Sequence, residues 1–138
     1  MIPEILITAA LIWYLFAEGL TEGYSWATVE RRKTNKLIKP KDVVNDYHSW
    51  RTFGENVGIT GAVIAAAYAG PTLAAALAVV AGWLLGLFIY DKALHYVTDG
   101  EASPEYHIAG FTLPRWGSWW QYLKLGVGTA AFVGMFFV

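Results

Sequence analysis

The stretch from Val57 to Tyr90 contains no Lys or Arg, and this feature constrains the fold more than any other. A helix needs roughly 20 mostly apolar residues to cross the ~30 Å hydrocarbon core of a bilayer, because each residue adds about 1.5 Å. The stretch is too long for one crossing. Gly70 and Pro71 divide it, since both residues end helices and Pro is tolerated in a first helical turn. We therefore expect two spans joined by a tight hairpin, with one long kinked helix as the alternative.

Further apolar segments lie towards both ends of the chain. The predicted spans cover about residues 4–24, 48–69, 72–92 and 116–138. Of the 138 residues 56% are hydrophobic and only 15% are charged, against about a quarter charged in a soluble domain. We expect one all-α, polytopic membrane domain over residues 1–138 with four transmembrane helices, or three if the long helix is kinked. The first segment lacks a basic leader and a small-residue cleavage site, so we interpret it as a retained span.

Small residues are frequent in these spans. Lipid tails are as apolar as Leu, so helices in a membrane associate through close backbone approach at Gly and Ala. Gly58 and Gly61 in the second span and Gly82 in the third fit such an approach. We expect close helix packing, especially between the two helices of the hairpin.

The basic residues indicate the orientation. All ten Lys and Arg residues lie on one side under the four-span prediction: Arg31, Arg32, Lys33, Lys36, Lys39, Lys41, Arg51, Lys92, Arg115 and Lys124. Basic residues stay on the cytoplasmic side, so we predict a multi-pass protein of the cell (inner) membrane with its N- and C-termini outside. A kinked three-span chain would separate Lys92 and Arg115 from the other basic loop. Lys124 is close enough to the interface to extend its ammonium to it.

Ionisable residues inside predicted spans are costly, which makes them functional candidates. They share a helix face within each of the first three spans, at spacings of three or four: Glu18 and Glu22, then His48, Arg51 and Glu55, then Asp91 and His95. The predicted topology brings the three faces to one depth, in the cytoplasmic third of the helices. We expect these side chains to meet there.

Three interpretations of this constellation stay open. In the first, Arg51 and the imidazoles neutralise the carboxylates and join the helices in a polar network. In the second, carboxylate and imidazole ligands hold a divalent transition metal, although bundle di-metal proteins use Glu-x-x-His pairs, which this chain lacks. In the third, the acids and His form a proton or ion path. The outer halves of the spans are almost purely apolar, which disfavours the third.

Several of these residues occur in an order that resembles a known group. The matching features are Glu18-x-x-x-Glu22-Gly23, His48-x-Trp50, Ile89-Tyr90-Asp91, Asp99-Gly100 and Tyr106-x-x-x-Gly110. They resemble a loose group of uncharacterised small integral membrane proteins of bacteria and phages. The resemblance implies an acidic pair in the first span, a His opening the second and an acid ending the third. The chain departs from the pattern at Glu22 and Tyr90, where the group implies Asp and Phe.

No motif in the chain identifies a reaction. Gly-x-Ser-x-Gly, P-loop and dinucleotide fingerprints are absent, there is no Cys, and a net charge of −1 gives no reason to expect nucleic acid. We expect a non-catalytic small membrane protein, either an accessory subunit of a larger membrane assembly or a homo-oligomer. Its partners would be bilayer lipid, other membrane subunits or copies of itself. The alternatives are a metal-dependent membrane enzyme with a cytoplasmic-side carboxylate/histidine site, and a proton or ion transporter.

Overall fold

The computed structural model describes residues 1–34, 50–98, 105–108, 111–114 and 118–138, and this part of the chain is almost entirely helical, as predicted. Helix α1 is much longer than its apolar part, because its polar continuation contains no Pro and, beyond Gly23, no Gly. The π-helix η2 leads directly into α3, and a short 3-10 turn, η3, ends the chain. The bounds are α1 Ile2–Thr34, η2 Trp50–Asn56, α3 Val57–Ala69, α4 Leu73–Thr98, α5 Ser118–Gly134 and η3 Met135–Phe137.

The turn at Gly70 divides the long apolar stretch into two separate helices. Gly70 has a φ of 70°, a left-handed conformation that Gly adopts without a Cβ clash. Its N–H donates to the carbonyl of Ala66 at 3.1 Å. On the other side of the turn, the N–H of Ala75 donates to Thr72 Oγ1 at 3.1 Å, which caps the start of α4. The predicted hairpin is present, and the segment is not one kinked helix.

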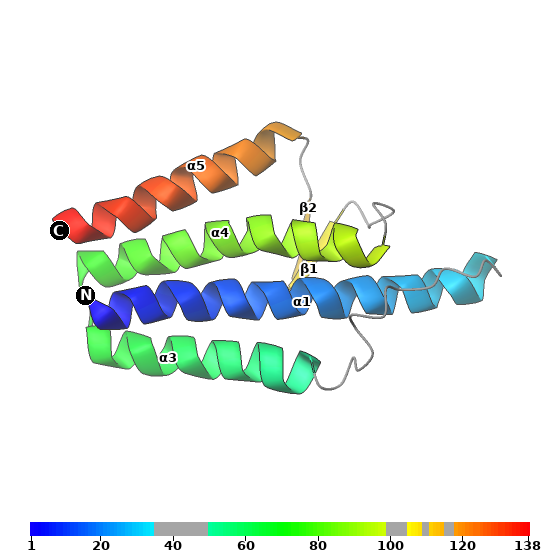
Figure 1. Ribbon diagram of the computed structural model, residues 1–138, viewed down its shortest axis with the longest axis horizontal. Coiled ribbons are helices and arrows are strands. Elements are labelled where there is room, and N and C mark those ends of the chain that lie inside the picture. The colour runs from blue at the N-terminus through cyan, green and yellow to red at the C-terminus, as the bar shows by residue number, and fades with distance from the viewer. Residues whose placement is uncertain (35–49, 99–104, 109–110, 115–117) are drawn as a thin grey trace.

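The four α-helices of the described residues lie side by side in one layer, in the order α5, α4, α1, α3 (Figure 1). Helix α1 contacts both α3 and α4, and α5 contacts α4. The two helices of the hairpin are therefore separated by α1 over most of their length. Our expectation that they would pack mainly on each other is wrong, because the N-terminal helix fills the space between them.

Glycines bring α1 into backbone contact with both neighbours. A Cβ atom at Gly19 would lie 2.6 Å from the carbonyl oxygen of Tyr90 in α4, and one at Gly58 in α3 would lie 2.7 Å from Cβ of Tyr14. Cβ atoms do not approach other atoms so closely in proteins, so these two positions exclude a larger side chain. The predicted packing residues Gly58, Gly61 and Gly82 do serve close helix packing, but against α1.

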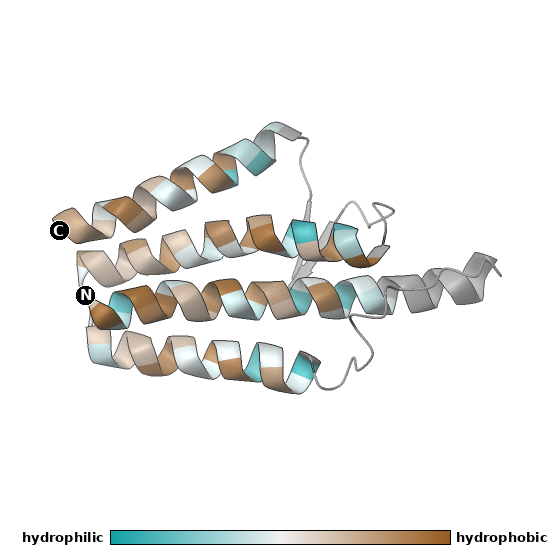
Figure 2. Ribbon diagram, viewed as in Figure 1, coloured by the Kyte–Doolittle hydropathy of each residue, from teal (hydrophilic) through white to brown (hydrophobic). Residues whose placement is uncertain are grey.

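Both termini and the turn between α3 and α4 lie at the same end of the layer, which we call the terminal end (Figure 1). Hydrophilic residues of the described helices gather towards the opposite end, apart from a few near the start of α1 (Figure 2). The buried apolar residues nearest the terminal end come from α1, α3, α4 and η3 and form one cluster: Ile7, Leu11, Ala62, Ala65, Ala75, Ala78 and Met135. The hydroxyl of Thr8 in α1 donates a hydrogen bond to the carbonyl of Ala78 in α4 at 3.1 Å.

A short β-hairpin lies between α4 and α5 in the chain. Strand β1 (Glu105–Ile108) pairs with β2 (Phe111–Pro114) in an antiparallel register. Both strands contain aromatic and β-branched residues, which favour extended backbone. The strands have four residues each, too short for an alternating pattern to stand out in the sequence.

Gly19→Ala should destabilise the protein, whereas Gly126→Ala should not. Alanine improves helix propensity by up to about 1 kcal/mol at both positions. At Gly19 its Cβ would meet the backbone of Tyr90, while at Gly126 no atom lies within 4 Å. We expect a net loss of about 1–3 kcal/mol at Gly19 and no loss at Gly126, measured by thermal unfolding in a mild detergent. Equal melting temperatures for the two variants would contradict the close approach of α1 and α4.

Candidate functional site

Five of the six described candidate residues belong to two polar groups, one on each side of the contact between α1 and α4. The first, here called the carboxylate group, comprises Glu18, Glu22, Arg51 and Glu55. The second, here called the Asp91 group, joins α4 to α5. The backbone contact between Gly19 and Tyr90 places both groups at a similar level of the layer.

The carboxylate group lies between α1 and η2, which contact each other. The carboxyl of Glu18 interacts directly with that of Glu55 and lies within electrostatic range of Glu22 and Arg51. Arg51 Nε is 4.0 Å from Glu55 Oε2, but the Arg51 side chain is 62% exposed and that of Glu55 only 15%. The guanidinium therefore lies at the rim of the group, while two carboxyls meet inside it.

The local backbone of this group is unusual. Arg51 and Glu55 belong to η2, a π-helix of seven residues. Such helices are rare and occur frequently at functional sites. An ionised carboxylate only accepts hydrogen bonds, so two carboxyls in contact need a shared proton or a cation between them. The geometry of Glu18 and Glu55 is thus suited to holding one positive charge.

The Asp91 group consists of Asp91, Gln121 and Lys124. Lys124 Nζ lies 2.5 Å from Asp91 Oδ2, and Gln121 Nε2 donates to the same oxygen. The exposed fraction is 0% for the Lys124 side chain and 2% for that of Asp91. Our prediction that Lys124 extends to the interface is wrong, because its ammonium turns inward to a carboxylate on the neighbouring helix.

The structure brings together four of the seven predicted site residues and places Asp91 and His95 apart from them. Asp91 faces α5 and not the carboxylate group. His95, one turn further along α4, is exposed, and His48 lies outside the described residues. In the part of the chain that the structure describes, no group of three or more His, Asp or Glu side chains could hold a metal ion. A divalent metal at these residues therefore stays a prediction.

Gln121 and Lys124 are the site residues that the sequence analysis missed. They are three residues apart on one face of α5. This spacing is a usable signal, since side chains three apart on a helix are neighbours. The spacing does not indicate, however, which helix these two side chains contact.

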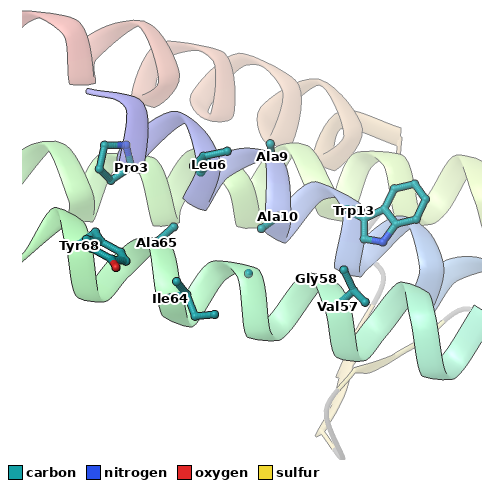
Figure 3. A pocket seen from close by; sticks show the side chains of 11 residues that line it. Pro3, Leu6, Ala9, Ala10, Trp13, Val57, Gly58, Ile64, Ala65 and Tyr68 are labelled. Atoms are coloured by element: carbon teal, nitrogen blue, oxygen red, sulfur yellow. The ribbon is translucent and has the colours of Figure 1, made fainter.

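A groove of about 600 Å³ runs between α1 and α3 (Figure 3). Leu6, Ala10 and Trp13 line it from α1, and Ile64 and Tyr68 line it from α3. None of the residues that line it is charged. Binding sites for polar molecules usually contain a few placed polar groups, so this groove suits apolar chains and not a polar substrate.

No protein-family model, no curated protein and no solved structure matches this chain. We therefore base the proposed function on the two polar groups and on the arrangement of the helices.

Asp91→Asn should strongly destabilise the protein, because it leaves the ammonium of Lys124 buried without a carboxylate. Removing one partner of a buried ion pair costs about 3–5 kcal/mol. Adding Lys124→Met removes the second charge and should recover most of that loss. The measurement is the unfolding of both single variants and of the double variant in mild detergent. A double variant no more stable than Asp91→Asn would show that the two residues are not coupled.

Arg51→Ala should cost less than about 1 kcal/mol, because exposed ion pairs contribute little. The same unfolding measurement compares this variant with Asp91→Asn. A loss as large as that of Asp91→Asn would mean that Arg51 neutralises buried carboxylates, contrary to its position at the rim.

Proposed function

We propose that this chain is an integral protein of the cell (inner) membrane, crosses the bilayer four times and has both termini outside. We further propose that it is non-catalytic and acts as a homo-oligomer or as an accessory subunit of a larger membrane assembly. The single-layer arrangement of its helices is the observation that carries this proposal.

The lengths of the helices support the four crossings. Ile2–Ser25 and Leu73–Val97 are long and apolar enough to cross a membrane, and they are the two such segments among the described residues. Helix α3 has 13 residues and continues the 7 residues of η2. Helix α5 has 17 residues and continues into the 3 residues of η3. Each combined segment therefore matches the roughly 20 residues that a bilayer requires.

The exposed surface of the layer supports lipid contact. Val63 on α3 is 65% exposed, and Tyr122 and Phe137 near the two ends of α5 are 76% and 83% exposed. Soluble monomers rarely expose apolar patches larger than a few hundred Å². In a bilayer such side chains face lipid or neighbouring helices without cost, and the free edges along α3 and α5 offer surfaces for further helices.

The charge distribution supports the orientation. The terminal end brings together Met1, the Gly70 turn and Val138, and no Lys or Arg stands near any of these in the sequence. Loops that carry Lys and Arg stay in the cytoplasm. The terminal end is therefore assigned to the outside.

The Asp91 group and the groove favour a non-catalytic role. The Asp91 group is closed, since its ammonium and its carboxylate are both fully buried and neutralise each other. The groove between α1 and α3 is apolar and suits lipid or an apolar side chain. Neither feature presents a reactive group to a substrate.

The contact between Glu18 and Glu55 favours one second candidate, a site that takes up a proton or a cation as part of an ion transporter or a metal-dependent enzyme. Elemental analysis and ion flux in liposomes separate these possibilities from the first proposal. Stoichiometric metal, or a flux that disappears in Glu18→Gln, would support the second candidate.

Blue-native electrophoresis of membranes solubilised in mild detergent tests the proposed role. We expect the chain to migrate as an oligomer or with partner subunits, because α3 and α5 each have a neighbouring α-helix on one side only among the described residues. A variant with Val63→Arg on the free edge of α3 should reduce the larger species if that edge is used. Migration as a single chain at all detergent concentrations would contradict the proposal.

A further inference from the structure

Helix α5 is poorly suited to cross a membrane by itself. It has 17 residues, and its first two turns contain Gln121 and Lys124. It does not reach the length and apolarity by which segments of α1 and α4 qualify as spans. A lysine is among the most costly residues to insert, so a helix of this composition needs compensation from elsewhere.

Asp91 in α4 supplies that compensation. The side chains of Gln121 and Lys124 both donate to one oxygen atom of Asp91. The Lys124 ammonium has no exposed surface, so it is neutralised inside the protein and not by water or lipid headgroups. One turn beyond Lys124, Gly128 packs so closely on α4 that a Cβ atom there would lie 2.9 Å from Leu85. Helix α5 thus contacts α4 closely with its ammonium turned towards Asp91.

We propose that α5 is a dependent span, which enters the membrane only by pairing with Asp91 of α4. Without this carboxylate, α5 stays on the cytoplasmic side and Val138 does not reach the outside. The inference rests on the proposed four-span topology and adds a conformational device to it. One side chain of α4 then decides on which side of the membrane the C-terminal end of α5 lies.

The test uses cysteine reporters in the full-length chain, which contains no Cys of its own. Val138→Cys reports on α5, and Pro71→Cys reports on the turn between α3 and α4. Each reporter is labelled in intact cells with a membrane-impermeant maleimide, before and after permeabilisation. Without further changes, both reporters should be labelled from outside. With Asp91→Asn, labelling of the Val138→Cys reporter should fall at least about tenfold, while the Pro71→Cys reporter stays unchanged.

A compensating variant separates the dependence from general misfolding. Adding Lys124→Met to Asp91→Asn should restore outside labelling of the Val138→Cys reporter, because α5 no longer carries a charge. The matched control Lys92→Met removes an exposed lysine from α4 and should not restore it. Unchanged labelling of Val138→Cys in Asp91→Asn, or loss at both reporters together, would overturn the dependence. Absence of outside labelling before any change at Asp91 would overturn the four-span topology itself, so the two failures are distinguishable.

Discussion

Backbone contact at glycines holds α1 between α3 and α4, and the other features of the molecule depend on it. Gly58 packs on Tyr14 from one side, and Gly19 packs on Tyr90 from the other. With α1 in this place, its acidic face turns towards η2, and the far side of α4 is left for α5. The positions of both polar groups therefore follow from two close helix contacts. In the proposed membrane setting these contacts depend on dispersion forces and complementary shape, because lipid provides no hydrophobic effect between helices.

Local features of the sequence predicted local structure well. Gly70 and Pro71 predicted the turn between α3 and α4, because the conformational limits of these residues act over a few positions. The span predicted over about residues 4–24 lies within the longer helix α1, and the shared face of Glu18 and Glu22 followed from their spacing. The sequence did not predict which helices are neighbours, since α3 has small residues that could pack equally well on α4 or on α1. Only the three-dimensional arrangement decides between them.

Lys124 shows that the prediction of site residues from sequence has the same limit. A lysine about two turns inside a membrane helix can extend to the interface or pair with a buried acid, and its spacing fits both. Asp91 likewise shares a helix face with His95 in the sequence, yet it is buried against α5 while His95 is exposed. The candidate acids were found from the sequence because charge inside an apolar helix is conspicuous. Their partners were not, because an ion pair between α4 and α5 leaves no periodic pattern in either helix.

The central claim is that the helices form one layer with α1 between α3 and α4, and disulfide cross-linking tests it most directly. A Cβ atom at Gly61 would lie 3.6 Å from Cβ of Ala10, within the roughly 3.5–4.5 Å that a disulfide requires. The pair Ala10→Cys with Gly61→Cys should therefore form a bond within one chain under mild oxidation. The pair Ala66→Cys with Ala130→Cys, placed on exposed positions of α3 and α5, should not form one within a chain. An intramolecular bond in the second pair and none in the first would show a closed bundle and contradict the account.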